Sequence, residues 1–184
     1  HAIAAEIRVT AKPEDIATAD RIVLPGVGAF KDCRDGLNAV PGLRPAIETA
    51  VKQKGRPFLG ICVGMQLLAT RGLEHDVTEG FGWIPGDVKL ITPTDASLKI
   101  PHMGWNQVRR RHESPLLEGI PDDSYFYFVH SYAADISEYT IATADYGWPF
   151  TAVAGRDNFH AAQFHPERSG PLGARILENF LGLC

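Results

Sequence analysis

The chain has 184 residues, a net charge of −4 and three cysteines. The length suits one well-filled domain over residues 1–184. The net charge is small and there is no long basic run, which argues against nucleic-acid binding. The densest basic patch, Arg109–His112, is typical of a solvated strand end. No apolar run is long enough to span a bilayer, and three widely spaced cysteines argue against a disulfide framework, so we expect a cytoplasmic protein.

The first third of the chain alternates between strand and helix patterns. In chain order these patterns predict the end of a helix at His1–Ala5, a strand at Glu6–Thr10, a short helix from Pro13, a buried strand at Arg21–Leu24, helices at Phe30–Val40 and Leu43–Lys54, and a buried strand ending at Cys62 that leads into a helix reaching about Arg71. Such alternation is typical of a parallel sheet with helices on both faces.

The second half of the chain is dominated by strand patterns. They occupy Asp87–Ile91, Gln107–Arg109, Tyr125–Val129, Ile141–Ala144, Thr151–Gly155 and Phe159–Phe164. Gly155–Asn158 is typical of a hairpin turn, and Gly170–Leu183 has the spacing of an amphipathic helix with Leu172, Ile176, Leu177 and Phe180 on one face. The sequence therefore predicts an α/β fold, with a mostly parallel central sheet flanked by helices and an additional antiparallel β portion in the second half.

The stretch Pro57–Leu68 contains the pattern Gly-x-Cys-x-Gly at Gly60, Cys62 and Gly64. This pattern is typical of a nucleophile elbow, a sharp turn from strand to helix that exposes one side chain. Both glycines have a steric reason, because the elbow brings the strand and helix backbones close together. A helix N-terminus favours the thiolate, so we interpret Cys62 as a nucleophile. The alternative is a buried structural cysteine.

A thiolate nucleophile needs a base, and His165 is the best candidate among the seven histidines. It ends a predicted strand at Pro166, and Glu167 can turn toward its imidazole because residues two apart in an extended chain face the same side. Cys62, His165 and Glu167 would then form a catalytic triad, in which the carboxylate fixes the tautomer of the imidazole. The alternative is a surface glutamate beside a structural histidine.

Acyl transfer also needs donors for the developing oxyanion. The backbone N–H of Val63 is one candidate, and the glycine-bearing loop Pro25–Gly28 can supply others at Val27 and Gly28, because glycine lets the backbone reorient. By itself this loop is also consistent with a simple turn or a phosphate cradle, although it lacks the spacing of a dinucleotide fingerprint and the lysine of a P-loop.

Five blocks in the right order resemble one family. Gly60–Gln66 with His165–Glu167 resembles the triad of class I glutamine amidotransferases. Within that class, further blocks look like the glutaminase subunits of imidazole glycerol phosphate synthase: Pro25–Phe30, Pro101–Asn106, Tyr127–Tyr132 and His165–Gly170. The resemblance covers about residues 6–180. The family normally begins with an apolar strand and a glycine-rich loop, and neither precedes His1, so we interpret that N-terminal strand as missing.

The resemblance implies an enzyme that hydrolyses glutamine and passes ammonia to a (β/α)8-barrel cyclase in a heterodimer serving histidine biosynthesis. By the same resemblance Cys62 attacks the amide and His165 moves the protons. The positions that match glutamine-holding residues are Gly28, Gln66, Ser131 and Tyr132. Trp105, Asn106 and Tyr127 are the candidates for the partner interface, with a core tryptophan as the alternative for Trp105.

No metal or organic cofactor is expected, because the thioester route requires none. A zinc site at His102 and His130 is the alternative, but their spacing fits no ligand pattern. Two other functions stay open at this point. A stand-alone cysteine hydrolase, or another amidotransferase on the same scaffold, would have the elbow and triad but no evident use for the block Met103–Asn106. A non-catalytic interaction module would tolerate the loss of any triad residue.

Overall fold

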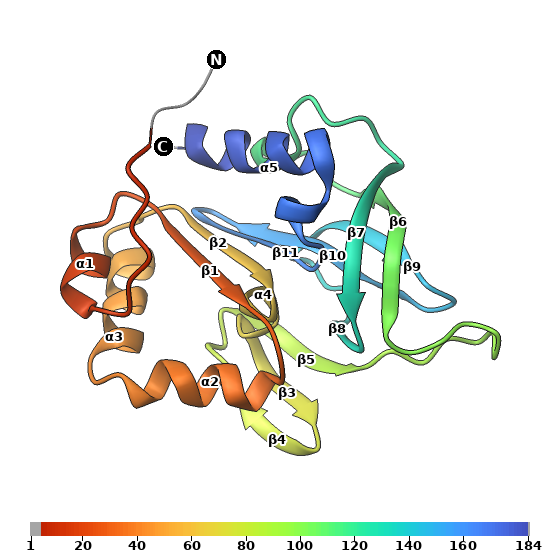
Figure 1. The fold of residues 1–184 in the computed structure, drawn as a ribbon, viewed down its shortest axis with the longest axis horizontal. Coiled ribbons are helices and arrows are strands. Elements are labelled where there is room, and N and C mark those ends of the chain that lie inside the picture. Colours follow the sequence, from red (N-terminus) through yellow and green to blue (C-terminus); the bar gives the residue numbers. More distant parts are fainter. Residues whose placement is uncertain (1–4, 184) are drawn as a thin grey trace.

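The computed structural model describes residues 5–183 (Figure 1). Its helices are α1 (Pro13–Thr18), α2 (Phe30–Ala39), α3 (Leu43–Glu48), which continues into a π-helical stretch (Thr49–Gln53), α4 (Val63–Gln66) and α5 (Gly170–Gly182), with short 3-10 turns at Pro115–Leu117 and Pro166–Arg168. Its strands are β1 (Ile22–Gly26), β2 (Phe58–Cys62), β3 (Ala69–Glu74), β4 (Asp76–Glu79), β5 (Ile84–Leu90), β6 (His102–Arg110), β7 (Ser124–His130), β8 (Tyr132–Ala134), β9 (Thr140–Asp145), β10 (Pro149–Arg156) and β11 (Phe159–Ala162).

A seven-stranded sheet runs in the order β1-β2-β11-β10-β9-β6-β7. Within this sheet, as residues 5–183 form it, β1–β2 and β2–β11 pair in parallel and the other neighbours are antiparallel. The α/β class is confirmed, but a mostly parallel sheet is wrong. Parallel neighbours need crossover connections, whereas β10 and β11 are joined by the predicted hairpin turn, where Asp157 has φ +54°. The parallel part of this sheet thus consists of β1, β2 and β11, the strands around Cys62.

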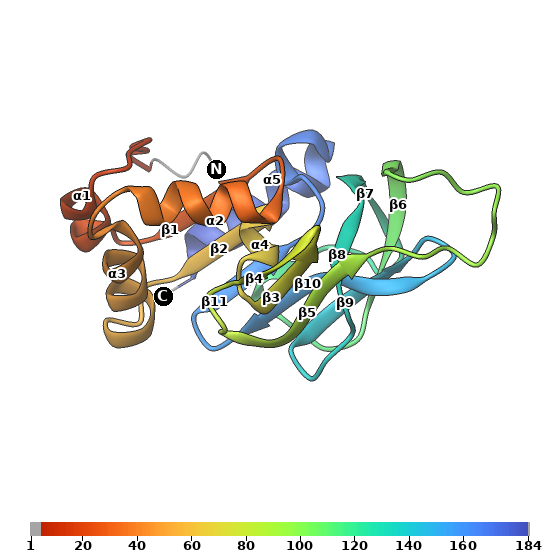
Figure 2. The ribbon, with the colours of Figure 1, turned by 90° about the horizontal axis from the view of Figure 1, so that it is seen from below.

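A second, smaller sheet has the order β4-β3-β5-β8 and lies next to α4 (Figure 2). The sequence predicts a helix from Cys62 to about Arg71, but α4 ends at Gln66 and β3 of this sheet begins at Ala69. The carbonyl of Leu67 accepts from the N–H of Phe81, and the carbonyl of Leu68 accepts from Trp83 and the following residue. Because a distant segment uses the carbonyls that a longer helix would need, this helix prediction is wrong.

Two predictions about the N-terminal region also fail. Glu6–Thr10 is not a strand: it has no strand partner among the described residues, is mostly exposed, and is held by polar contacts such as that of the Thr10 hydroxyl to Asp15 at 2.6 Å. Strand β1 is less buried than expected, because it lies at the end of the sheet and leaves Val23 46% exposed. The predicted helix end at residues 1–5 lies outside the described residues except for Ala5, which is not helical.

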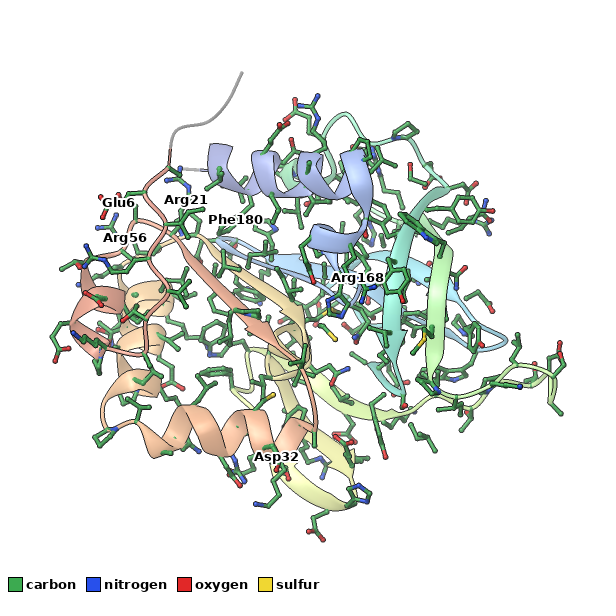
Figure 3. All side chains as sticks on the ribbon, viewed as in Figure 1. Glu6, Arg21, Asp32, Arg56, Arg168 and Phe180 are labelled. Carbon is green, nitrogen blue, oxygen red and sulfur yellow. The ribbon has the colours of Figure 1, made fainter. Side chains whose placement is uncertain are left out.

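Helices cover both faces of the parallel strands (Figure 1). On one side α5 contributes Ile176 and Phe180 to the cluster that contains Leu59 of β2. Phe180 is labelled on α5 in Figure 3. On the other side α3 contributes Ile47 to the cluster that contains Phe58. The alternation of neighbouring β2 side chains between the two clusters follows from the strand period of two. This packing fixes β2, and with it the position of Cys62 at the carboxyl end of the strand.

Candidate active site

Cys62 is the last residue of β2 and has φ 54° and ψ −112°, a conformation that non-glycine residues rarely adopt. A Cβ on Gly64 would lie 1.8 Å from the carbonyl oxygen of Leu24, and one on Gly60 would lie 2.7 Å from the carbonyl oxygen of Gly64. A side chain at Gly60 would separate β2 from α4, and a side chain at Gly64 would separate the neighbouring strand β1 from α4. The steric reason for both glycines is therefore confirmed.

The backbone conformation at Cys62 leads to a prediction about the free energy of unfolding. A strained non-glycine conformation costs about 1–3 kcal/mol, and glycine removes that cost. We expect Cys62→Gly to have a free energy of unfolding about 1 kcal/mol or more above that of Cys62→Ala, measured by urea denaturation. Both variants lack the thiol, so the comparison isolates the backbone. Equal or lower stability of the glycine variant would show that the elbow is unstrained.

Burial raises the pKa of the Cys62 thiol to about 11. The backbone N–H of Val63 opposes this shift, while the negative charge of Glu167 adds to it. The N–H at the start of α4 therefore favours the thiolate, as expected, but α4 has only one turn and the effect of burial on the thiol is larger. Near neutral pH the thiol keeps its proton, and catalysis requires a base to remove it.

His165 is oriented by hydrogen bonds to its side chain and to its backbone. Its Nδ1 lies 2.7 Å from Oε1 of Glu167, its backbone N–H donates to the carbonyl of Tyr127, and its carbonyl accepts from the hydroxyl of Ser169 at 2.6 Å. The predicted contact between His165 and Glu167 is thus confirmed. Because a carboxylate accepts the Nδ1–H, Nε2 keeps its lone pair, and this buried atom has no hydrogen-bond partner among the described residues. The imidazole is therefore set up to accept a proton at Nε2.

Cys62 and His165 line one cavity of about 290 Å³, close to the size of small-ligand pockets. The expected oxyanion and substrate-binding residues line the same cavity. Its walls consist of Val27, Gly28, Cys62, Val63, Gln66, Glu74, Pro101, Val129, His130, Ser131, Tyr132 and His165. The fold thus brings together the loop after β1, the β2–α4 elbow, the connection from β7 to β8 and the segment after β11, as the sequence blocks required.

Glu74 is a cavity residue that the sequence interpretation missed. It lies at the end of β3, and its Oε2 accepts a hydrogen bond of 2.8 Å from the N–H of Phe30 at the start of α2. This contact holds a carboxylate beside Gly28 in the cavity wall. A carboxylate there could bind the ammonium group of an amino-acid substrate. The residue was missed because the sequence pattern carried no sign of the β3–β4 hairpin.

Gln66 and Gln163 form a buried amide pair behind the nucleophile. Nε2 of Gln66 donates to the carbonyl of Tyr132 at 2.8 Å and to Oε1 of Gln163 at 3.0 Å. Nε2 of Gln163 in turn lies 3.7 Å from Sγ of Cys62. Gln66 was expected to hold substrate, and here its amide hydrogens also fix the backbone of Tyr132. Gln163, which sequence reasoning did not single out, links that backbone to the thiol.

The loop after β1 carries the expected oxyanion residues. Gly28 has φ +100°, a conformation that favours glycine, and Val27 is 78% exposed. The carbonyl of Val27 accepts from the thiol of Cys33 at 3.4 Å. Gly26, just before, pairs in register with Cys62. The loop therefore lies beside the nucleophile and combines exposure with a backbone that can reorient.

One face of the β6–β7 hairpin exposes apolar side chains beside the cavity. Trp105 is 56% exposed and Met103 is 61% exposed. The rings of Trp105 and Tyr127 meet edge-on, with their centroids 6.1 Å apart. The guanidinium carbon of Arg168 lies 4.5 Å from the centroid of the Tyr127 ring, and Arg168 lies next to β7 in Figure 3. A core tryptophan is excluded. Asn106 points to the other face of the sheet and bonds to Asp145, so it does not belong to this exposed face.

The described residues can also be assessed for a metal site and for a membrane-spanning helix. Residues 5–183 contain no group of three or more His, Cys, Asp or Glu side chains placed to hold a metal ion. His130 uses both ring nitrogens in hydrogen bonds to protein atoms, which argues against the zinc interpretation. None of the helices in the described range is long and apolar enough to cross a membrane.

The fold and the family comparison define the class of this protein: the model of the family "Glutamine amidotransferase class-I" matches residues 2–183, and the chain belongs to this family. Among individual proteins, the chain is 56% identical to the imidazole glycerol phosphate synthase subunit HisH of Rhizobium meliloti, over 97% of this chain and 85% of that protein. It is 54% identical to the subunit of the same name from Brucella suis, over the same shares of the two chains.

Solved structures of low sequence identity share the fold. A crystal structure of a glutamine amidotransferase superposes with a TM-score of 0.70 at 16% identity, covering 97% of this chain and 88% of that chain. The glutaminase domain of a Trypanosoma brucei CTPS, with bound acivicin, gives a TM-score of 0.62 at 14% identity, covering 94% and 75%. The α/β architecture of this family is therefore confirmed.

Proposed function

We propose that this protein hydrolyses glutamine to glutamate and ammonia and delivers the ammonia to a (β/α)8-barrel cyclase subunit, which makes imidazole glycerol phosphate in histidine biosynthesis in the cytoplasm. The observation that carries the proposal is the single cavity that joins Cys62 on its elbow to the His165–Glu167 pair. The names of relatives more than 50% identical over nearly the whole chain support the choice of pathway and partner.

The first half of the proposed reaction forms a thioester. Nε2 of His165 accepts the thiol proton, and the sulfur of Cys62 attacks the carbon of the glutamine side-chain amide. The N–H of Val63, with one from the Val27–Gly28 loop, stabilises the negative oxygen of the tetrahedral intermediate. The imidazolium of His165 then gives its proton to the departing nitrogen, which leaves as ammonia.

The second half of the reaction releases glutamate. Water replaces ammonia beside His165, gives a proton to Nε2 and attacks the thioester carbon. Collapse of the second tetrahedral intermediate breaks the carbon–sulfur bond, and the proton returns to the sulfur of Cys62. Glu167 keeps the imidazole in the required tautomer throughout, and the carboxylate of Glu74 is placed to hold the substrate ammonium group.

The oxyanion loop is the proposed point of control. A free glutaminase would waste glutamine, so the resting loop should lack one donor until the partner docks. A missing donor reduces transition-state stabilisation by about 2.7–4 kcal/mol, or roughly a hundred- to a thousandfold in rate. The exposure of Val27 and the positive φ of Gly28 leave the loop free to reorient.

The proposed function is tested by measuring glutamate formation by the purified protein, alone and with the cyclase subunit of the same organism and its ligand. We expect slow hydrolysis alone, strong stimulation by the liganded partner and glutamine-dependent product formation by the complex. Absence of glutamine hydrolysis in both samples would refute the proposed glutaminase activity. Equal rates in both samples would refute the proposed stimulation by the partner.

Trp105 provides a test of the partner surface. An exposed aromatic side chain of this kind is typical of an interface hot spot, whose truncation costs about 2 kcal/mol or more. We expect Trp105→Ala to weaken partner binding about thirtyfold while basal glutaminase activity stays within twofold. Titration of stimulated activity against partner concentration measures this. Val77→Ala, an exposed apolar residue of the other sheet, is the control. Unchanged affinity and stimulation would exclude Trp105 from the interface.

A further inference from the structure

A pair of buried histidines lies directly behind the cavity wall. His102 of β6 and His130 of β7 are register partners, and only 2% and 6% of their surfaces are exposed. Nδ1 of His102 lies 3.0 Å from Nε2 of His130. The proposed reaction gives neither residue a chemical step, although His130 lines the cavity.

The hydrogen bonds around the pair determine its tautomers. Nδ1 of His130 lies 2.9 Å from the carbonyl oxygen of Tyr132, which can only accept, so this Nδ1 carries the hydrogen. Nε2 of a neutral His130 is then an acceptor, and Nδ1–H of His102 must be the donor to it. Nε2 of His102 in turn accepts from the side-chain amide of Asn106, 3.3 Å away. All donors therefore point one way, from Asn106 through both rings to Tyr132.

The surroundings keep this arrangement neutral. The ring of His102 stacks on those of Tyr146 and Phe128, with centroid separations of 4.1 and 5.0 Å. The ring of His130 contacts that of Phe150. The Tyr146 ring lies against His102, and the charge of His165 acts on His130. Among residues 5–183, no hydrogen bond or ion pair joins a carboxylate to either ring. Burial lowers the pKa of His102 to about 4 and that of His130 to about 3. Both rings are therefore uncharged near neutral pH.

The hydrogen bonds that run from Asn106 through both histidines end at the Ser131–Tyr132 segment. The proposed function assigns this segment to glutamine binding. The carbonyl of Tyr132 accepts from His130 on one side and from Gln66 on the other. The carbonyl of Ser131 is fixed by the N–H of Ile91. Ser131 and Tyr132 both line the cavity. Their backbone is thus held by His130, by Gln66 and by the neighbouring strand β5. The contact with His130 leads back to β6, the strand that carries Trp105, because His130 is the partner of His102.

We propose that Asn106, His102 and His130 form a one-directional hydrogen-bond relay that positions the Ser131–Tyr132 segment for glutamine. They are positioning residues and do not touch the reacting atoms. The inference rests on the proposed function for its substrate, but the relay itself is a property of the resting protein. Because Asn106 follows Trp105 in β6, the relay also connects the proposed partner surface with the glutamine site.

The first test reads the tautomers of the full-length protein by nitrogen-15 NMR. We expect Nδ1–H tautomers for both histidines, a scalar coupling between the paired nitrogens, and no titration of either ring above about pH 5.5. His102→Asn and His130→Asn variants assign the signals. An Nε2–H tautomer at His130, or titration of either ring near pH 6.5, would overturn the relay. This result does not depend on enzyme activity, so it stands or falls separately from the proposed function.

The second test measures glutamine kinetics of the partner-stimulated complex. We expect His102→Ala to raise KM about tenfold, equivalent to about 1.4 kcal/mol, with a smaller change in kcat. His102→Asn should restore most of the loss, because the Asn amide nitrogen occupies the position of Nδ1 and can donate to His130. His102→Gln, whose amide lies one bond farther out, should not restore it.

The matched control is His160→Ala, which removes a similarly buried histidine of β11 whose Nδ1 has no hydrogen-bond partner within residues 5–183. It creates a similar cavity without touching the relay, so KM should stay within twofold of wild type. An unchanged KM in His102→Ala, or an equal rise in both variants, would reduce the pair to a packing role and overturn the proposal. If the alanine variants fail to fold, the tautomers of the wild-type protein decide.

Discussion

Cys62→Ala should abolish glutamine-dependent product formation by the complex with its cyclase partner while ammonium salts still support it. The reason is that the thiol acts only in releasing ammonia, and the cyclase uses ammonia whatever its source. Other groups that remain in the cavity cannot form the thioester, so we expect glutaminase activity to fall by at least about 10⁴-fold. The fold should persist, because alanine occupies the same backbone position with less side-chain volume in the cavity wall.

The measurement compares initial rates with glutamine and with ammonium chloride at saturating partner. The ammonium-dependent rate is the internal control, since it reports that the variant complex is assembled and the partner is active. Turnover of glutamine near the wild-type rate would show that Cys62 is not the nucleophile. Loss of both activities would point instead to a failure of assembly.

His165→Ala should be nearly as damaging as the loss of Cys62. With a pKa of about 11, the buried thiol is a thiolate in only about one molecule in a thousand at pH 8, so the structure offers no ready nucleophile without the base. The imidazole also supplies the proton for departing ammonia. We expect kcat to fall on the order of a thousandfold or more, and the effects of Cys62→Ala and His165→Ala not to add.

Glu167→Gln should cost less, on the order of ten- to a hundredfold in kcat. The Gln oxygen can still accept the Nδ1–H of His165, and removal of the negative charge takes away one of the causes that raise the pKa of Cys62. The three variants are compared as stimulated kcat with glutamine and as ammonium-dependent rates. A larger loss in Glu167→Gln than in His165→Ala would overturn the roles assigned to the two side chains.

Several parts of the site could be predicted because their causes are local. The glycine at position 60 follows from the sterics of the turn itself, because a Cβ there would meet the backbone of Gly64, and the contact of His165 with Glu167 follows from side chains two residues apart at a strand end. The turn at Gly155–Asn158 and the final helix likewise depend on neighbouring residues. Five ordered blocks also allowed the family to be recognised before any geometry was known.

What only the tertiary structure decided depends on partners far away in the chain. The helix after Cys62 ends early because residues 81–84 take the carbonyls of Leu67 to Ala69, and Glu74 enters the cavity only through the hairpin that results. The thiol pKa is set by burial, which no local pattern reports. The pairing of His102 with His130 depends on the register of β6 against β7. Local sterics are fixed by neighbouring residues, whereas hydrogen-bond partners and desolvation are fixed only when distant segments meet.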